Sequence, residues 1–143
     1  MFFSKSCEYA LRATMYLAKI EEDQKTSIQV IAKELDMPAD YLNKVLQILV
    51  KSDIISSAKG RNGGFFLTKN SINQPLIRIV HAIDGEEVFR KCGLGINDCS
   101  SDRPCPLHND IKAYRENLRL ALSSNSIAST RTGTIAGETY LSR

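Results

Sequence analysis

Residues 38–67 read PADYLNKVLQILVKSDIISSAKGRNGGFFL, and this stretch decides the fold. It predicts a helix that begins at Pro38, because proline fits the first helical position and apolar residues recur at i, i+3, i+4 and i+7. These apolar residues are Leu42, Val45, Leu46 and Leu49. A strand-like segment starting at Ile54, a glycine-rich turn at 59–64 and a second strand at 65–67 follow, since Asn-Gly and Gly-Gly steps tolerate positive φ. The stretch therefore predicts a helix followed by a β-hairpin.

Two further helices are predicted before this stretch. Residues 4–21 carry apolar residues at helical spacing. Thr26 begins the pattern Thr-Ser-Ile-Gln, which fits a capping box, and a short helix follows through Leu35. This short helix and the longer one behind it are joined by a tight turn at 36–38, so they form a helix-turn-helix candidate. With the hairpin directly after them, residues 1–84 are predicted to form a winged helix-turn-helix domain.

The excess of basic residues lies in the same stretch. The chain has a formal net charge of +3. Between residues 38 and 69 the cations are Lys44, Lys51, Lys59, Arg61 and Lys69, and the acids are Asp40 and Asp53. A glycine-rich hairpin tip that carries Lys59 and Arg61 suits the phosphate backbone or the minor groove of double-stranded DNA. An ordinary solvated face and a protein-binding winged helix are the alternatives.

The rest of the chain divides into three segments. Residues 85–106 form a loop rich in Cys, Gly and Pro. Residues 107–123 predict an amphipathic helix, with the apolar stripe Ile111, Tyr114, Leu118, Ala121 and Leu122. This helix is expected to form a homodimer, because palindromic DNA sites favour two-fold symmetry; packing on its own domain is the alternative. The Ser-, Thr- and Gly-rich residues 124–143 predict a mobile tail. The predicted fold class is mainly α, with a small β-hairpin wing and a C-terminal dimerisation helix.

The loop gathers the residues that could bind a metal. Cys92, Cys99 and Cys105 are separated by gaps of six and five residues, and His108 follows three residues after the last. Thiolates suit soft metals and iron–sulfur clusters, and wide gaps favour a cluster over zinc, whose structural sites usually have C-x₂₋₄-C spacing. A disulfide with a spare thiol, or three unliganded thiols, are the other interpretations. Cys7 stands apart on the first helix and is expected to be a core residue.

These motifs together resemble the IscR/NsrR-type bacterial winged-helix regulators. The resemblance runs over residues 1–123 and rests on four motifs in order. They are Tyr9-Ala10-Leu11-Arg12-Ala13, the helix start Pro38-x-x-Tyr41-Leu42, the wing Lys59-Gly60-Arg61-Asn62-Gly63-Gly64-Phe65 and the three-cysteine loop. The resemblance implies a homodimer that binds promoter DNA and carries an iron–sulfur cluster, of the 2Fe-2S type in preference to the 4Fe-4S type.

The resemblance also implies roles for particular residues. Cys92, Cys99 and Cys105 match the family's ligand cysteines. His108 matches the histidine ligand of IscR-like members, while Glu8 falls where other members bring in a carboxylate from the partner subunit, so both stay candidates for the fourth ligand. DNA contacts in the family come from the start of the third helix and from the wing. The corresponding residues here are Pro38, Asp40, Tyr41, Asn43, Lys44, Lys59 and Arg61.

The sequence therefore predicts a cytoplasmic transcriptional regulator whose promoter binding is controlled by an iron–sulfur cluster that senses iron or cluster supply, redox state or nitric oxide. A regulator whose cysteines form disulfides on oxidation is the alternative, and a cluster carrier with a vestigial winged helix is a third hypothesis. An enzyme is not expected, because no nucleophile–base pair and no phosphate loop occur. No apolar run approaches the roughly 18 residues of a membrane span, and the N-terminus lacks the apolar stretch of a signal peptide.

Overall fold

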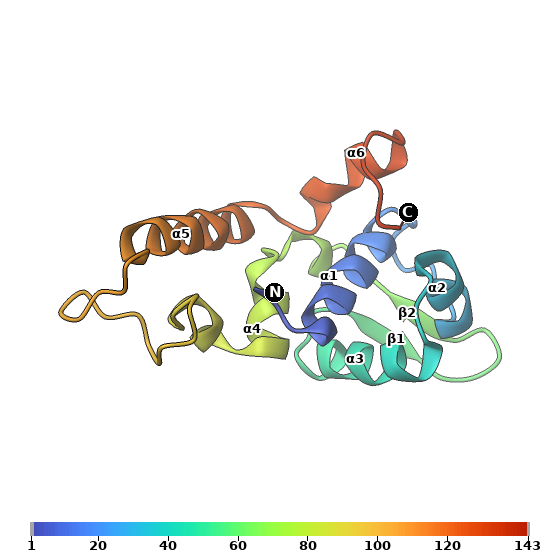
Figure 1. Cartoon of the computed structure of the whole chain (residues 1–143). Coiled ribbons are helices and arrows are strands. Elements are labelled where there is room, and N and C mark those ends of the chain that lie inside the picture. Colours follow the sequence, from blue (N-terminus) through green and yellow to red (C-terminus); the bar gives the residue numbers. More distant parts are fainter. Residues whose placement is uncertain (1, 143) are drawn as a thin grey trace.

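The computed structural model describes residues 2–142 of the chain, which form a mostly helical structure with one small hairpin (Figure 1). The helices are α1 (Lys5–Ala18), α2 (Ile28–Leu35), α3 (Ala39–Lys51), α4 (Ile77–Asp84), α5 (His108–Ser124) and α6 (Arg131–Ile135). The strands are β1 (Ser56–Ala58) and β2 (Gly64–Phe66), and the short 3₁₀ helices are η1 (Ser71–Asn73), η2 (Glu86–Phe89) and η3 (Ala128–Thr130). This order confirms the predicted winged-helix fold class.

The core lies between α1, α2, α3 and α4. The four apolar residues predicted for one face of α3 are all buried, and they share the core with Leu17 of α1, Ile31 of α2 and Ile79 of α4. The apolar faces of α2 and α3 are both buried in this core, and this burial holds the two helices together as a helix-turn-helix pair. Cys7 is fully buried in this core, as the sequence indicated.

The cap of α2 lies one residue later than predicted. Ser27 is the N-cap, and its hydroxyl accepts a hydrogen bond from the backbone N–H of Val30. Thr26 instead exchanges two backbone hydrogen bonds with Phe65 of β2, at 2.9 and 2.8 Å. Thr26 therefore forms an isolated β-bridge with the hairpin, and Ser27 takes the N-cap position of α2.

The hairpin is shorter than predicted, and β2 begins at Gly64, the last residue of the predicted turn. β1 begins at Ser56, because Ile54 and Ile55 point into the core immediately before it. The antiparallel register pairs Ser57 with Phe65. Gly64 has a φ of +146°, and a Cβ at this position would lie 2.5 Å from the carbonyl oxygen of Thr26. Only glycine fits there, so the wing depends on this residue.

α5 projects away from the winged helix, and the cysteine-rich loop reaches the far end of the molecule (Figure 1). The helix spans 17 residues and lies one residue later than predicted. Its buried residues are His108, Arg115 and Leu122, whereas Tyr114 and Ala121 of the predicted apolar stripe are exposed. Within one chain, α5 therefore buries only one edge of the predicted stripe, where Leu122 is buried and Ile111 and Leu118 are half-buried.

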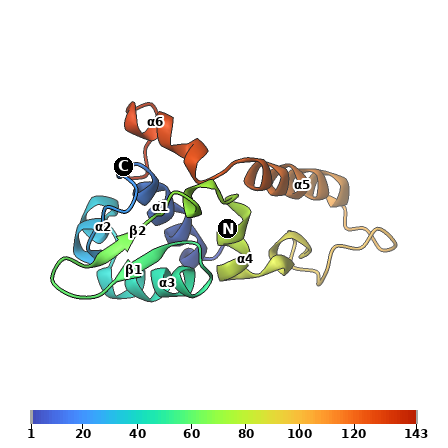
Figure 2. The same cartoon turned by 180° about the vertical axis from the view of Figure 1, so that it is seen from behind.

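The structure departs from the expected mobile tail at residues 124–142. Ile127 is fully buried, and its backbone N–H donates to the carbonyl of Gln74 at 2.9 Å. Further along, Nε of Arg12 donates to the carbonyl of Leu141 at 2.6 Å. The segment with η3 and α6 packs beside α1 in both views (Figures 1 and 2). Backbone hydrogen bonds and the buried side chain of Ile127 hold this segment against α1. The amino-acid composition of the segment indicates neither of these contacts.

No helix among residues 2–142 is both long and apolar enough to cross a membrane.

Candidate metal centre and DNA interface

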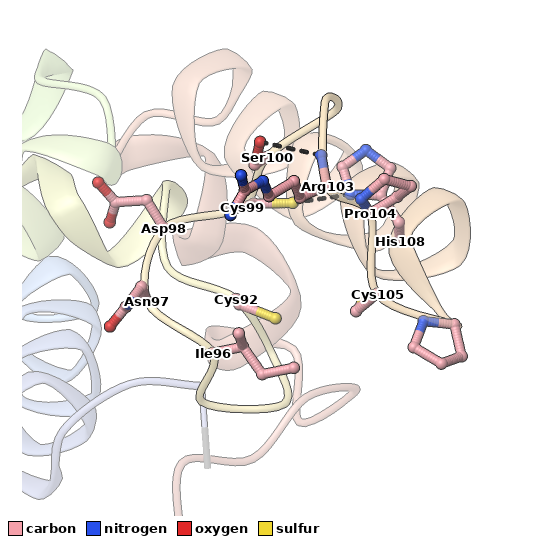
Figure 3. Close-up of a pocket in the computed structure, with 11 residues that line it drawn as sticks. Cys92, Ile96, Asn97, Asp98, Cys99, Ser100, Arg103, Pro104, Cys105 and His108 are labelled. Atoms are coloured by element: carbon pink, nitrogen blue, oxygen red, sulfur yellow. Dashed lines mark hydrogen bonds between the residues drawn. The ribbon is translucent and has the colours of Figure 1, made fainter.

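The three loop cysteines and His108 line one open cavity of about 500 Å³, between the loop and the start of α5 (Figure 3). Their thiols carry no disulfide and are partly exposed. The structure therefore brings together the four residues that the sequence grouped by spacing alone.

A small antiparallel pairing positions the first two cysteines. Lys91 and Asp98 form an isolated β-bridge. On either side of it, the N–H of Cys92 donates to the carbonyl of Asn97 and the N–H of Cys99 donates to the carbonyl of Arg90, both at 2.9 Å. We call residues 90–99 the cysteine hairpin. Because the backbone makes this pairing, the positions of Cys92 and Cys99 relative to each other are fixed by the hairpin itself.

The last cysteine and the histidine are positioned by the start of α5. The N–H of His108 donates to the carbonyl of Cys105 at 3.0 Å. His108 is only 8% exposed, and its Nδ1 lies 3.2 Å from Sγ of Cys99. Two ligands of one tetrahedral metal ion lie about 3.5 Å apart, given the usual metal–sulfur and metal–nitrogen bond lengths. The Cys99–His108 separation is close to that value.

Local dipoles and charges act on the thiol of Cys92. The backbone N–H groups of Leu94 and Ile96 lower its pKa, and the side chain of Cys105 and the positive charge of Arg115 act in the same direction. A lowered pKa favours the thiolate, which is the form that binds metals and attacks oxidants. By contrast, burial raises the pKa of Cys7 to about 12, with Asp84 adding to the effect. Cys7 is therefore chemically separate from the loop cysteines.

The predicted DNA-contacting residues lie on α3 and the wing. Asp40, Tyr41 and Lys44 are exposed on the first turns of α3, while Asn43 is half-buried. Pro38, predicted as the first helical residue, is the exposed N-cap. α3 and the turn between β1 and β2 occupy the same lower edge of the molecule in both views (Figures 1 and 2). This turn carries Lys59 and Arg61, both exposed, so the structure places the two predicted DNA-reading elements along one side.

Tyr41 is also part of the packing between α1 and α3. Its hydroxyl lies 2.5 Å from the Oγ of Ser6, and its ring packs edge-on against Tyr9 at 5.5 Å. The tyrosine is therefore fixed in direction although it is exposed.

Residues 3–130 match the Rrf2 family, which is described as iron-dependent transcriptional regulators. The chain belongs to the Rrf2 family. The regulator NsrR of Geobacillus kaustophilus is 39% identical over 112 residues, which cover 75% of this chain and 76% of that protein. This Rrf2 protein is a transcriptional regulator and not an enzyme, in line with the names of its relatives.

Solved structures show the same fold. CymR, the global cysteine regulator of B. subtilis, superimposes with a TM-score of 0.73 at 18% identity, covering 91% of this chain and 95% of that one. IscR of T. potens superimposes with a TM-score of 0.69 at 15% identity, covering 96% and 90%. The Rrf2 winged helix and its C-terminal extension are thus shared along nearly the whole chain.

The cavity of this Rrf2 protein has the donor set of an iron–sulfur site. Three thiols and one imidazole are soft or borderline ligands, and all four face the same space. Across residues 2–142, no three Cys, His, Asp or Glu side chains converge at the separations needed by a single metal ion. The types of these donors suit an iron–sulfur cluster, whereas their positions in this structure do not form a preassembled site for a single metal ion.

The sequence offered Glu8 only as a ligand from the partner subunit, so its position on its own chain leaves that prediction open. Glu8 lies on α1, where it pairs with Lys5 at 3.4 Å, and it does not line the cavity of its own chain. Arg115 had no predicted role, yet it is buried and donates from Nη1 to the carbonyl of Lys91 at 2.7 Å. The sequence did indicate that Arg115 shares a helical face with Ile111 of the apolar stripe, because the two residues are four positions apart.

Proposed function

We propose that this Rrf2 protein is a homodimeric, DNA-binding transcriptional regulator whose promoter affinity is controlled by an iron–sulfur cluster in the cysteine-lined cavity. The observation that carries the proposal is the convergence of three loop thiols and the His108 imidazole on one cavity at the base of α5. Cys92, Cys99, Cys105 and His108 would hold the cluster. When bound, a cluster supplies a centre that changes charge on reduction and reacts with oxidants or nitric oxide.

A 2Fe-2S cluster fits this donor set better than a 4Fe-4S cluster. Imidazole replaces thiolate in known 2Fe-2S centres, where it raises the potential. The short separation of His108 from Cys99 supports the histidine as the fourth ligand. Glu8 of the same chain is engaged by Lys5, which gives the carboxylate a partner already.

The chain's own residues suit DNA readout by a dimer. Asn43 on α3 can read a base edge in the major groove, and Lys44 can contact a phosphate. Lys59 and Arg61 would contact the flanking backbone or minor groove. α5 exposes Tyr114 and Leu120 at 59% and 50%, and burying these side chains against a second α5 would form the dimer.

The test is a comparison of metal content and DNA affinity in matched cysteine variants. Protein purified without oxygen is expected to contain iron and acid-labile sulfide in equal amounts, about two of each per chain. The triple variant Cys92→Ala, Cys99→Ala and Cys105→Ala should lose both and should change its salt-matched promoter affinity. Cys7→Ala should keep both. A triple variant with unchanged iron content and DNA affinity would overturn the proposal.

A thiol switch is the second candidate function, favoured by one observation. The side chain of Cys105 interacts with the thiol of Cys92 and lowers its pKa, so these two thiols are the candidates for a disulfide. On oxidation by hydrogen peroxide, two thiols would lose two hydrogens and form one S–S bond, while the hydrogen peroxide is reduced to two water molecules. Mass spectrometry of oxidised, metal-free protein reports this two-hydrogen loss. DNA binding that responds to it in protein lacking iron would favour this function over the cluster.

A further inference from the structure

The chain on both sides of Cys92 is held against one face of α5. On one side, the carbonyl of Lys91 accepts a hydrogen bond from Nη1 of Arg115 at 2.7 Å. On the other side, Gly93 presses on Ile111, so that a Cβ at this glycine would lie 3.1 Å from both Cδ1 and Cγ2 of the isoleucine. Cys92 is therefore fixed between two contacts that come from the same helix.

The same face of α5 carries the histidine of the cavity. His108, Ile111 and Arg115 are spaced by three and four residues, which places them on one side of a helix. We call these three residues the anchor face of α5. The anchor face thus supplies one candidate ligand directly and fixes the segment that carries another.

Within the described part of the chain, Arg115 is buried without an ion pair. Its side chain is 8% exposed, and among residues 2–142 no carboxylate lies within ion-pairing distance of it. Burying an unpaired cation is costly unless another group offsets the charge. A site with three metal-bound thiolates is anionic, and it lies next to the residue whose carbonyl Arg115 holds.

We infer that Arg115 is a positioning residue of the cysteine-lined cavity, which together with Ile111 ties the first thiol of the site to α5. This inference rests on the proposed role of the cavity as a metal site. Because α5 holds the segments around two candidate ligands, any change in the loop is transmitted to the orientation of α5. The DNA-reading α3 and wing lie at the opposite end of the molecule, so such a link is needed if the loop is to control them (Figure 1).

Cobalt(II) titration of the metal-free full-length chain tests the inference without requiring a cluster. Thiolate-to-cobalt charge-transfer absorption reports how many loop thiols bind. We expect Arg115→Met to weaken cobalt affinity by about 10-fold or more, the usual effect of removing a residue that orients a ligand. Arg115→Lys should restore part of the affinity, because an ammonium can still donate to the carbonyl of Lys91.

Two matched controls separate positioning from general damage. Arg119→Met removes an arginine one turn further along α5, where its guanidinium pairs with the carboxylate of Glu116, and it should leave cobalt affinity unchanged. Gly93→Ala should weaken cobalt binding, and adding Ile111→Ala should restore it, because the smaller side chain makes room for the new methyl group. If circular dichroism shows that Arg115→Met is unfolded, the comparison of Gly93→Ala with the Gly93→Ala, Ile111→Ala double variant tests the inference instead.

In protein that carries a cluster, the reduction potential gives a second readout. Loss of a nearby positive charge disfavours the more negative reduced state, so Arg115→Met should make the potential more negative, whereas Arg119→Met should not. Wild-type cobalt affinity in both Arg115→Met and Gly93→Ala would overturn the inference. A wild-type chain that assembles no cluster, but in which Arg115→Met still weakens cobalt binding, would refute the proposed function and leave Arg115 as a positioning residue.

Discussion

The imidazole Nδ1 of His108 lies 3.2 Å from Sγ of Cys99, although nine residues separate them in the chain. The contact joins the end of the cysteine hairpin to the first residue of α5. Within one chain, His108 therefore lies beside a loop thiol, whereas Glu8 of the winged helix does not line the cavity.

Replacing His108 is therefore expected to impair cluster binding more than replacing Glu8. His108→Ala removes a donor that faces the cavity, whereas Glu8→Ala removes a carboxylate paired with Lys5. Iron and sulfide per chain after anaerobic reconstitution, together with the visible spectrum, measure the effect. Loss of the cluster in Glu8→Ala with retention in His108→Ala would instead assign the fourth ligand to the partner subunit.

Alkylation should distinguish Cys7 from the loop cysteines. Burial raises the pKa of Cys7 to about 12, so this thiol stays protonated at pH 8 and reacts slowly. In the metal-free native chain, iodoacetamide is expected to label Cys92, Cys99 and Cys105 and to spare Cys7. Peptide mass spectrometry reads the labels, and all four should react in denaturant. Native labelling of Cys7 at the loop rate would contradict the buried position.

The reaction of Cys92 should also depend on pH in a defined direction. The N–H groups of Leu94 and Ile96 lower its pKa, so its thiolate fraction should exceed that of an ordinary thiol, with a pKa of about 8.5, at the same pH. Its labelling rate in metal-free protein is expected to reach half of its maximum at a lower pH than that of an unfolded control. A midpoint equal to the control's would show that these backbone contacts do not persist in solution.

The wing residues should contribute to DNA affinity through phosphate contacts. Lys59→Ala and Arg61→Ala are each expected to weaken binding to all duplexes and to reduce the slope of log affinity against log salt by about 1. Asn43→Ala should instead weaken the free energy of binding by about 1–3 kcal/mol, and only for duplexes that the wild-type protein selects from a random pool. Lys112→Ala, an exposed change on α5, is the matched control. Equal effects of Lys112→Ala and Lys59→Ala would exclude the wing as the contact.

The C-terminal segment should contribute to stability. Ile127 is fully buried, so Ile127→Ala is expected to lower the free energy of unfolding by about 2–5 kcal/mol. Ile135 is 58% exposed, and Ile135→Ala should stay within about 0.5 kcal/mol of the wild type. Denaturant titration measures both. Equal stabilities of the two variants would restore the interpretation of this segment as a mobile tail.

Local features of the fold were predictable from sequence. The stripe Leu42 to Leu49 follows the period of a helix, and a stripe of that kind must be buried against a partner element. The turn around Gly64 needs backbone conformations that side chains resist, and glycine marks such positions directly. The spacing of Cys92, Cys99, Cys105 and His108 likewise placed these four candidate ligands in one segment, whereas the fifth candidate, Glu8, lies on the first helix.

The sequence by itself thus determined the winged helix, its basic tip and the loop segment that holds four of the five candidate ligands, because each depends on residues near one another in the chain. Only the tertiary structure decided that Thr26 pairs with Phe65, that Ile127 is buried and that Arg115 holds the carbonyl of Lys91. Each of these depends on a contact between distant segments. Periodicity and composition each describe one segment of the chain. They therefore do not predict which backbone group or side chain of a distant segment will contact it.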